Sequence, residues 1–523
     1  VAVVNKETVL VIDRKEANPL LNARGHPAWG AVWSLLNNTA RPLNIRTHSF
    51  CSAGSFLSNG TLVNFGGQPY TNRNGEAAPD GQQGVRLFNA CPASGTCDIY
   101  EDSHRIRLGS NRWYPTSARL PDGSAIVLGG SMYAGWTNSE LNNNPTYEFY
   151  PAKNVNGYNG LPVPSQFFID TLPHNTLGVA DPYLSSLPDE RLFVAANNQA
   201  MLLDWRTNIE TRLPNFPNGQ RVVYPLNAAG VLLPLTPENN YTPEVVICGG
   251  SHISDQTASE NLDAQQDYGS AQCSRMVLNA AGISAGWKTE WMPEPRIMSE
   301  GTLLPDGKVL IINGGRTGTA GYENLMNRRG GSNADHPTFT PLLYDPAAPV
   351  GSRFSRAGLA TSNIARLYHS VATMLPSGAI MIAGSNPNDD TTTKPYASEY
   401  RVEYLYPPYM QKTRPTFTGL PAMVAYNAAF SLTITVPTAA RNVYAILMDY
   451  GFVTHSVHMD QKLVKLVSVR QGTNKLIVTG PPSAPVYSPG PGWIMVMADG
   501  VPSVAQQVMI GSGANPPEDA AAM

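Results

Sequence analysis

A turn-and-strand phrase that recurs along the chain constrains its fold more than any other feature. Each copy reads as an apolar residue, a turn rich in Pro, Asp or Gly, an apolar strand and two small residues. The six copies run from Phe56 to Gly67, Leu120 to Gly130, Leu187 to Ala196, Asn227 to Gly250, Leu304 to Gly315 and Leu375 to Gly384. The small-residue pairs recur roughly every 54 to 69 residues, a period that predicts the four-stranded blades of a kelch-type β-propeller.

The two ends of this repeat region indicate how a ring of blades would close. Six blades account for residues from about 49 to 406, and strands at Thr8 to Ile12 and Ala31 to Leu35 predict a seventh. We expect a strand from the other end, such as Arg401 to Leu405, to complete that blade, because shared closure hides two sheet edges. The expected fold of residues 1–410 is therefore a seven-bladed propeller.

The repeat stops after Tyr406-Pro407-Pro408-Tyr409. Five further strands, separated by turn-rich spacers and without paired glycines, are expected at Phe430 to Val436, Val443 to Met448, Leu463 to Arg470, Lys475 to Thr479 and Trp493 to Ala498. Their number and spacing predict an immunoglobulin-like β-sandwich over residues 411–512. Residues 513–523 are expected to form a flexible tail. The whole chain is thus predicted to be all-β.

Composition excludes some classes of partner. Only 14% of the 523 residues are charged and the net charge is -3, so we expect no surface for nucleic acid or for an anionic membrane. No apolar run reaches the length of a membrane span. The start at Val1 without a basic, apolar leader suggests a processed N-terminus, and sequons at Asn37, Asn59 and Asn240 permit glycosylation. These features favour a secreted glycoprotein.

The five cysteines divide into two pairs and one remainder. Cys91 and Cys97 enclose a short loop, and Cys248 and Cys273 flank a longer polar one, so two disulfides are expected in an oxidising compartment. Cys51 is then the odd cysteine of the chain. By itself it is best explained as a buried, inert thiol.

A tyrosine directly before a histidine, Tyr368-His369, precedes the predicted strand that begins at Val371. Neighbouring residues of a strand point to opposite faces, so both can reach one metal ion only where the chain bends. The repeat places Tyr114 and Cys51 at matching positions of other blades, so these side chains would converge on one mouth of the propeller channel. The alternative is that they only pack between blades or make hydrogen bonds.

Imidazole and phenolate groups around an open position suit Cu(II) or iron, and a thiol beside a tyrosine ring can be oxidised onto it. Two further histidines, His455 and His458, lie three residues apart in a polar loop of the predicted sandwich. They are candidates for a local metal pair, although a histidine in a loop is more often solvated.

Four motifs of this sequence resemble those of the copper radical oxidases, the family of the galactose oxidases and glyoxal oxidases. They are Phe50-Cys51, Arg112-Trp113-Tyr114, Arg366-Leu367-Tyr368-His369-Ser370 and the stretch from Thr454 to Gln461. The resemblance covers nearly the whole chain, from His26-Pro27-Ala28-Trp29 to the final sandwich.

The resemblance implies a complete site. It implies a Cu(2+) ion with one exchangeable position, held by Tyr114, Tyr368, His369 and His455. It implies that Cys51 is joined to Tyr114 in a thioether that carries a radical, and that the sandwich loop threads through the propeller to supply His455 rather than His458. In the implied reaction Tyr368 accepts the hydroxyl proton, Tyr114 takes the carbon-bound hydrogen, and O2 leaves as H2O2.

Two departures favour the glyoxal oxidase branch. No stretch of this sequence corresponds to the carbohydrate-binding-type domain of galactose oxidase. After Gly129-Gly130-Ser131, where galactose oxidase has a tryptophan stacked on the cross-linked tyrosine, this sequence has Met132. Tyr133 and Trp136 are alternative candidates to shield the radical. We therefore expect a secreted monomer that oxidises small aldehydes such as glyoxal and methylglyoxal to carboxylic acids.

Two other functions stay open from the sequence. The same site would suit a primary alcohol or galactose-type oxidase, and the repeat alone would suit a kelch-type module that binds a glycan or a protein without catalysis. Substrate contacts are expected from the loops after Gly67, Ser131, Gly250 and Gly315, with His252, Gln256 and Asp335-His336-Pro337 as candidates.

Overall fold

The computed structural model describes residues 1–14, 18–73, 76–133, 141–171, 183–255, 257–388 and 395–522. Strands dominate this part of the chain. Its two α-helices, α1 (Gln166–Asp170) and α2 (Ala280–Ala285), are short, and single 3-10 turns lie at Pro217–Gly219, Pro237–Asn239, Ser259–Asn261, Pro408–Gln411 and Ala520–Ala522. No helix in the described ranges is long and apolar enough to cross a membrane.

Seven antiparallel sheets follow one another between residues 2 and 405. The first three contain β1 (Ala2–Val3), β2 (Thr8–Ile12), β3 (Gly30–Ser34) and β4 (Thr39–Pro42); β5 (Ala53–Phe56), β6 (Leu62–Phe65), β9 (Val85–Phe88) and β10 (Ile99–Glu101); and β11 (Thr116–Arg119), β12 (Ala125–Leu128), β13 (Thr146–Tyr150) and β14 (Val163–Pro164). The fourth and fifth contain β15 (Tyr183–Ser186), β16 (Leu192–Ala196), β17 (Gln199–Asp204) and β18 (Ile209–Arg212); and β19 (Ala228–Leu232), β20 (Glu244–Gly249), β21 (Gln272–Val277) and β22 (Lys288–Trp291). The last two contain β23 (Glu300–Leu303), β24 (Val309–Ile312), β27 (Leu342–Tyr344) and β28 (Phe354–Ser355); and β29 (Val371–Met374), β30 (Ile380–Ala383) and β31 (Glu403–Leu405).

Five of the six repeated turns join the first two strands of a sheet. Leu120 to Gly123, for example, links β11 to β12, which pair from Thr116 opposite Leu128 onward. The fourth copy differs from the prediction, because Asn227 to Gly230 leads into and forms β19 itself and the turn lies after Leu232. Gly230 allows the Tyr183 ring of the preceding sheet to pack closely against β19, because a Cβ atom on this residue would lie 2.5 Å from that ring.

The predicted sharing of a blade between the two ends of the repeat region is wrong. The first sheet takes all four strands from residues 2–42, and β31 pairs instead with β30 as the outer strand of the seventh sheet. Ala2–Val3, which the sequence pattern did not identify, supplies the missing inner strand by pairing with β2. The first and last sheets therefore meet by side-chain packing, with β1 in contact with β29.

The C-terminal residues form two further sheets. One has the order β32 (Thr416–Thr418), β34 (Ala429–Thr435), β40 (Lys475–Thr479) and β39 (Ser468–Gln471); the other has β33 (Met423–Val424), β43 (Gln506–Ile510), β41 (Gly490–Ala498), β35 (Val443–Asp449) and β38 (Leu463–Leu466), with β42 (Val501–Pro502) on β41. The single strand predicted from Leu463 to Arg470 is two strands, because the chain crosses from one sheet to the other at Val467.

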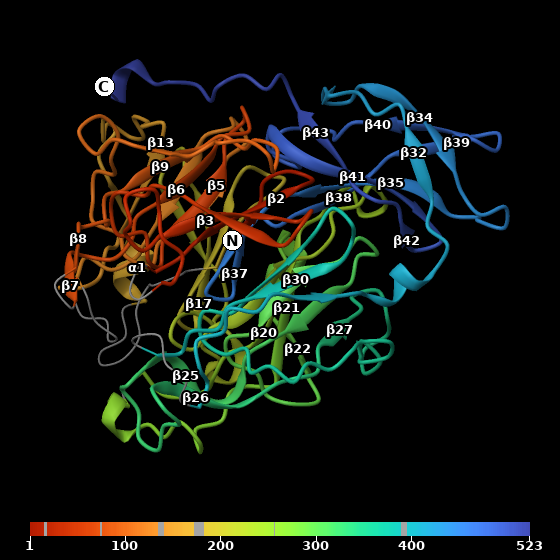
Figure 1. The fold of residues 1–523 in the computed structure, drawn as a ribbon. Coiled ribbons are helices and arrows are strands. Elements are labelled where there is room, and N and C mark those ends of the chain that lie inside the picture. Colours follow the sequence, from red (N-terminus) through yellow and green to blue (C-terminus); the bar gives the residue numbers. More distant parts are fainter. Residues whose placement is uncertain are drawn as a thin grey trace.

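The segment predicted to be a flexible tail lies against the second and third sheets (Figure 1). Ser58 Oγ donates to Ala514 O at 2.8 Å, and Asn154 N–H donates to Asp519 at 2.8 Å. Two small hairpins, β7 (Thr71–Arg73) with β8 (Glu76–Ala78) and β25 (Gly315–Tyr322) with β26 (Ser332–Pro337), lie at the opposite side of the molecule from the C-terminal sheets (Figure 1).

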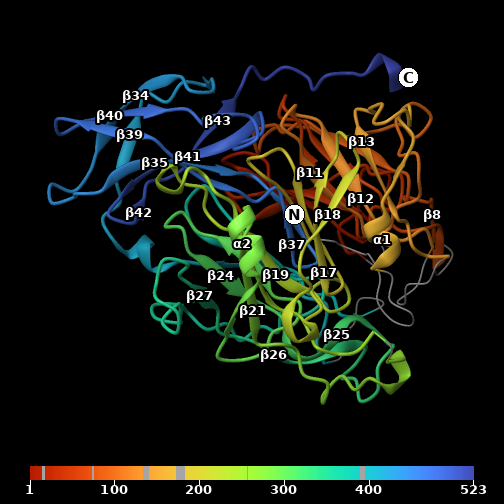
Figure 2. The ribbon, with the colours of Figure 1, turned by 180° about the vertical axis from the view of Figure 1, so that it is seen from behind.

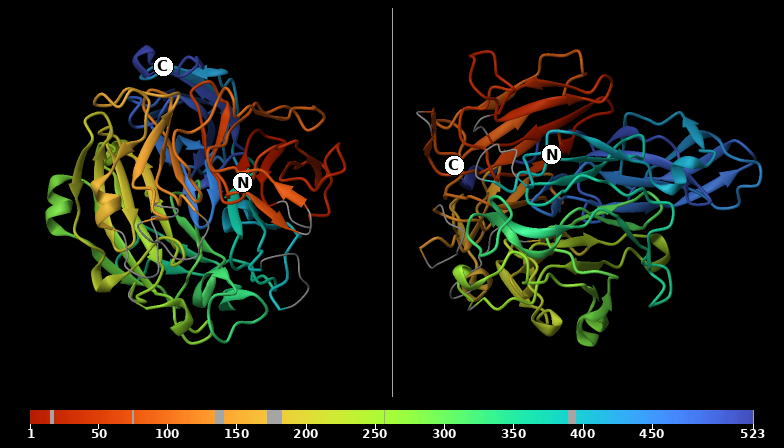
Figure 3. Two further views of the ribbon diagram at one scale, coloured as in Figure 1. Left: turned by 90° about the vertical axis from the view of Figure 1, so that its left-hand side faces the viewer. Right: turned by 60° about the horizontal axis from the view of Figure 1, so that its bottom comes forward.

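A hairpin of β36 (Phe452–Thr454) and β37 (Val457–Met459) leaves the C-terminal sheets and runs between the seven N-terminal sheets. It contacts the first strand of each of them: β1, β5, β11, β15, β19, β23 and β29. Figure 3 shows these sheets around the blue hairpin, with the C-terminal sheets to one side, and Figure 2 shows the same arrangement from behind. The close passage requires Gly54 in β5, since a Cβ atom there would lie 2.4 Å from the Phe452 ring.

Candidate metal centre

Backbone bends at equivalent places of the repeat aim side chains at one point. Cys51, Tyr114, Met298 and His369 each lie two residues before the first strand of a sheet. All four have left-handed backbones, with φ of 57°, 60°, 58° and 66°. Non-glycine residues adopt this conformation uncommonly, and it turns the chain sharply. The bend lets Tyr368 and His369, adjacent in sequence, face the same region.

The fifth participant comes from the hairpin tip. His455 lies between β36 and β37 and also has a left-handed backbone, with φ of 49°. The amide of Asn227, just before β19, donates from Nδ2 to His455 O at 2.8 Å. The seven-sheet part of the chain therefore holds this turn in place by its backbone and leaves the imidazole free to point inward.

These residues converge. The hydroxyls of Tyr114 and Tyr368 lie 2.8 Å apart. The ring of His455 is centred 5.2 Å from that of Tyr114, 5.5 Å from that of Tyr368 and 5.0 Å from that of His369. Cys51 Sγ and one nitrogen from each of His369 and His455 lie within 4.8 Å of one another. The five predicted site residues thus form one cluster.

Each imidazole offers one free nitrogen. His369 Nδ1–H donates to Asn386 O at 2.8 Å, and His455 Nδ1 lies 2.6 Å from Thr454 Oγ1. The Nε2 atom of both rings is buried and has no hydrogen-bond partner among the described residues. Burial lowers the pKa of His369 to about 3 and that of His455 well below its usual value, so both rings are neutral, as metal ligands must be.

The two phenols need a cation before they can act as phenolates. Burial, with the neighbouring Cys51 and tyrosines, raises the pKa of Tyr114 and of Tyr368 well above the usual value. A metal ion would reverse this trend, because its charge favours the deprotonated form of a ligand. Two neutral nitrogens and two such oxygens fit Cu(II), so the residues present suit the metal that the sequence implied.

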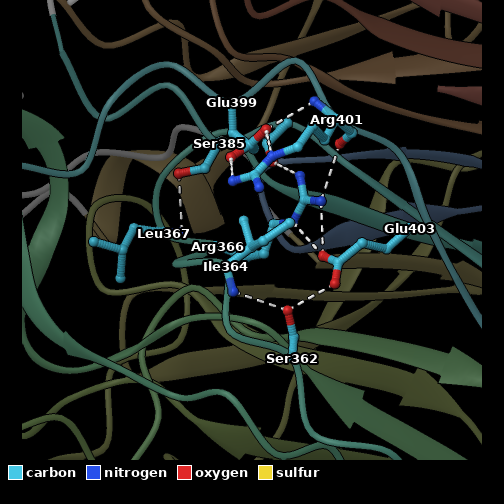
Figure 4. Close-up of polar contacts among 9 residues, drawn as sticks. Ser362, Ile364, Arg366, Leu367, Ser385, Glu399, Arg401 and Glu403 are labelled. Carbon is cyan, nitrogen blue, oxygen red and sulfur yellow. Dashed lines mark hydrogen bonds and ion pairs between the residues drawn. The ribbon is translucent and has the colours of Figure 1, made fainter. Parts of the chain in front are cut away.

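The loop that carries Tyr368 and His369 is braced by Arg366 (Figure 4). Its guanidinium is buried and donates to Glu403 at 2.7 and 3.0 Å, to Arg401 O at 3.0 Å and to Gly384 O. Leu367 N–H donates to Ser385 Oγ at 3.0 Å. Arg112 repeats the arrangement beside Tyr114, donating to Glu148 and to Gly129 O at 2.8 Å each. In each Arg-x-Tyr motif the arginine therefore holds the tyrosine loop against the glycine that follows the second strand of the same sheet.

Sequence reasoning missed Tyr224. Its ring stacks on that of Tyr114 with centroids 4.7 Å apart and planes 24° apart, and lies 6.0 Å from that of Tyr368. Of the three residues proposed as a shield, Tyr133 is 55% exposed, Met132 is half-buried and Trp136 lies outside the described residues. The sequence offered one signal for Tyr224, its position. It lies four residues before β19, the first strand of the fifth sheet, and Tyr114 lies two residues before β11, the first strand of the third.

The remaining sequence candidates lie apart from this cluster. His458 is buried on β37 beside Gly451, while His252 is exposed and contacts Asn218 O and Ser270. His336 contacts Thr317, and Gln256 lies outside the described residues. The pairs Cys91–Cys97 and Cys248–Cys273 are bonded as predicted, and Cys51 is buried and belongs to neither disulfide.

Three partly buried residues pack against the cluster that contains the centre. Ile253, Tyr322 and Tyr396 border the buried cluster that contains Cys51, Tyr114 and Tyr368. Arg14 Nη1 donates to the Tyr322 hydroxyl at 3.1 Å, and Asp335, which accepts from Tyr396, pairs with Arg329 at 2.9 Å. Aromatic rings with anchored hydroxyls therefore border this cluster.

Comparison with known proteins gives a consistent result along the chain. A family model described as the glyoxal oxidase N-terminus matches residues 14–409, and one described as the galactose oxidase-like early set domain matches residues 414–510. The aldehyde oxidase GLOX of Vitis pseudoreticulata is 32% identical over 97% of this chain and 94% of its own length. Aldehyde oxidase GLOX1 of Arabidopsis thaliana is 32% identical over 90% of this chain and 72% of its own.

A solved structure shares the fold. A fungal alcohol oxidase in complex with copper superimposes with a TM-score of 0.72 over 98% of this chain and 96% of that protein, at 16% sequence identity. The similarity extends over both the N-terminal sheets and the C-terminal sheets.

Proposed function

Because this chain belongs to the glyoxal oxidase branch of the copper radical oxidases, we propose that it oxidises small aldehydes to carboxylic acids and reduces O2 to H2O2. The observation that carries the proposal is the cluster of Tyr114, Tyr368, His369 and His455, with two orphaned imidazole nitrogens beside two hydrogen-bonded phenols. Cys51 lies in the same cluster.

We propose that the seven successive sheets are the blades of a propeller spanning residues 1–410, followed by a β-sandwich over 411–512. The central hairpin supports this interpretation, since a single element contacts the first strand of every sheet. Such contacts require the seven strands to surround one axis.

The proposed ligands of copper are Tyr114, Tyr368, His369 and His455. When bound there, copper would accept and return single electrons and would keep one position open for substrate and O2. His369 and His455 hold their Nε2 atoms toward the centre because their Nδ1 atoms are engaged by Asn386 O and Thr454 Oγ1.

The two tyrosines have separate roles in the proposed reaction. The Tyr368 oxygen, which lies 2.8 Å from that of Tyr114, would accept the hydroxyl proton of the aldehyde hydrate. The Tyr114 oxygen, in its radical form, takes the hydrogen atom from carbon, which removes one electron with the second proton. The other electron is taken up by the one-electron chemistry that copper supplies when bound, so two electrons and two protons leave the substrate. Tyr224 and the buried cluster around it exclude water from the radical.

The mass of the intact protein tests the proposal. After copper loading in air and glycan removal, we expect a mass lower than that of the chain with two disulfides by two further hydrogen atoms, lost in joining Cys51 to Tyr114. Cys51→Ala should fold, because the residue is small and buried, but should lack the radical and turn over at a small fraction of the normal rate. Normal turnover by this variant would refute the proposal.

A second arrangement is possible because Cys51 Sγ itself belongs to the group of potential ligands. A thiolate with two imidazoles is the ligand set of an electron-transfer copper site. Such a centre would keep Cys51 uncross-linked, with its full complement of mass, and would release no peroxide with any substrate. Mass and peroxide therefore separate the two functions.

We propose glyoxal and methylglyoxal as substrates, supported by the aldehyde oxidase names of the relatives. Peroxide release across aldehydes, primary alcohols and galactose would test this choice. Higher kcat/KM for alcohols or galactose would favour the alternative oxidase. Absence of peroxide with all of them would exclude both oxidases and favour the electron-transfer centre or a binding module.

We also propose that the protein is secreted and monomeric. The two disulfides support an oxidising compartment. Light scattering should give the mass of one glycosylated chain.

A further inference from the structure

The radical proposed for Tyr114 raises a question of electron count. Aldehyde oxidation and O2 reduction each exchange two electrons. Turnover therefore can neither generate the Tyr114 radical in the first place nor restore it after loss of one electron equivalent. One electron must therefore leave the Tyr114 side chain singly before the first turnover. This requirement for a one-electron acceptor rests on the proposed function.

A surface cavity of about 750 Å³ lies among loops next to the first two sheets, and none of its lining residues belongs to the metal centre. Arg24, His26, Asn44 and Arg46 line it, and Trp29 forms part of its wall. No acidic side chain lines it among the described residues, and neither guanidinium is paired with a described acid. Two carboxylates lie next to lining residues without lining the cavity themselves: Asp98 accepts from Asn44, and Glu101 accepts from the Arg46 N–H at 2.7 Å and pairs with Arg86 at 3.2 Å. The cavity is therefore suited to an anion.

A line of aromatic rings connects this cavity to the metal centre. Trp29 stacks on His48 with centroids 5.7 Å apart and planes 10° apart. His48 lies 6.2 Å from Phe50, and Phe50 lies 5.1 Å from His369. All of these rings except that of His369 are buried, and Phe50 is directly bonded to Cys51. A series of closely spaced aromatic rings couples electronically better than the same length of saturated chain does, so this line offers a route for an electron.

We propose that an anionic one-electron oxidant binds in the Arg24–Arg46 cavity and removes one electron from Tyr114 through Trp29, His48 and Phe50. In this step the phenolate oxygen of Tyr114 loses one electron and becomes a phenoxyl, and the oxidant gains that electron. No atom or proton changes place. The acceptor is defined by its chemistry: negative charge, a size that fits the cavity and a one-electron couple.

Binding is tested apart from redox chemistry with hexacyanocobaltate(III), an anion that cannot accept an electron under these conditions. Calorimetry on the copper-loaded protein should show one binding site. The variant Arg24→Gln/Arg46→Gln should weaken binding at low salt by about tenfold, as electrostatic attraction predicts, and added salt should reduce the difference. Lys412→Gln/Lys475→Gln, which removes the same charge from exposed positions of the C-terminal region, should bind as the unchanged protein does.

Electron transfer is tested by stopped-flow with hexacyanoferrate(III), which has the same shape and charge and does accept an electron. Radical absorbance should appear about tenfold more slowly in Arg24→Gln/Arg46→Gln than in the lysine control. With a cationic oxidant, tris(phenanthroline)cobalt(III), the two variants should not differ. Aldehyde turnover by enzyme that is already oxidised should be unchanged in both.

Trp29→Leu should bind hexacyanocobaltate(III) normally but form the radical more slowly, and Trp29→Phe, which keeps a ring, should recover most of the rate. Equal radical formation in Trp29→Leu and the unchanged protein would refute the route, and equal binding in the arginine and lysine variants would refute the site. If neither oxidant produces a radical in the unchanged protein, the proposed function fails instead, while anion binding still decides the cavity.

Discussion

Four residues, Cys51, Tyr114, Met298 and His369, have the same left-handed backbone at the same position, two residues before the first strand of a sheet. Such conformations cost free energy and persist where the surrounding structure fixes them. Here two buried arginine side chains fix the loops. Arg366 donates to Arg401 O and Arg112 donates to Gly129 O, each near the end of a neighbouring strand. Met298 shows that the bend is a property of the repeat, since it takes the same position without a ligand side chain.

Tyr224 is expected to determine how long the radical proposed for Tyr114 persists. Tyr224→Leu removes the stacked ring, and since aromatic pairs contribute roughly 0.5–1.5 kcal/mol, the radical should decay roughly two- to tenfold faster. Decay of the radical absorbance in the absence of substrate measures this. Tyr224→Phe keeps the ring and should behave like the unchanged protein. Faster decay in Tyr224→Phe would show that the hydroxyl, and not the stack, is responsible.

At the scale of elements, the contact between β5 and the central hairpin controls the position of His455. In Gly54→Ala the new methyl group would overlap Phe452, three residues before His455, and should displace the hairpin. We expect roughly 10- to 100-fold weaker copper binding, the usual effect of misplacing a ligand, measured by competition with a chelator. Gly54→Ala/Phe452→Leu should recover part of the affinity, and Phe452→Leu alone is the control.

Glu300, the first residue of β23, should make the stability of the fold depend on pH. Burial raises the pKa of Glu300 to about 8 from its usual 4.5, opposed by the Ser456 N–H. Between these values the folded chain holds a proton that the unfolded chain releases, so stability falls as pH rises, by roughly 1.4 kcal/mol per pH unit.

Glu300→Gln cannot ionise and should lose this dependence. Urea unfolding at pH 5 and pH 8 should show the variant gaining stability relative to the unchanged protein at the higher pH. Glu518→Gln, at an exposed position, is the control. An equal difference between Glu300→Gln and the unchanged protein at both pH values would contradict the assignment.

At the scale of the whole molecule, the two parts of the chain share one core. Phe56 of β5 and Tyr450 of the C-terminal region meet with ring centroids 5.2 Å apart. Arg119 of β11 forms a buried ion pair with Asp449, which directly precedes the hairpin region. Removing one partner of a buried pair strands the other charge, at a cost of about 3–5 kcal/mol.

A chain that ends at residue 410 is therefore expected to be insoluble or to bind no copper, because it lacks the hairpin that fills the centre of the seven sheets. Soluble yield and copper content measure this. Co-expression of residues 411–523 should restore part of both. A soluble, copper-binding fragment would show that the C-terminal region is dispensable for the site.

The sequence by itself determined the repeated units, since turn residues and strand patterns act locally and recur at fixed intervals. It determined the two disulfides and, through the repeat, placed Cys51 and Tyr114 at positions that match the Tyr368-His369 pair; that Tyr114 is equivalent to His369 rather than to Tyr368 emerged only from the structure. It failed at Ala2–Val3, at the split after Leu466 and at the outer strand β31, because partner choice between strands is not encoded in any one of them.

The convergence of His455 on the centre was implied only by the family resemblance, and the geometry of the centre was decided by the tertiary structure. Tyr224 carries no motif, and its stacking on Tyr114 depends on the order of sheets around the hairpin. His455 reaches the cluster from a separate region of the chain, more than 80 residues after His369, and spacing along the sequence carries no information about such a distance. A repeat fixes the direction of side chains within each sheet, whereas their convergence requires all seven sheets and the hairpin to be packed together.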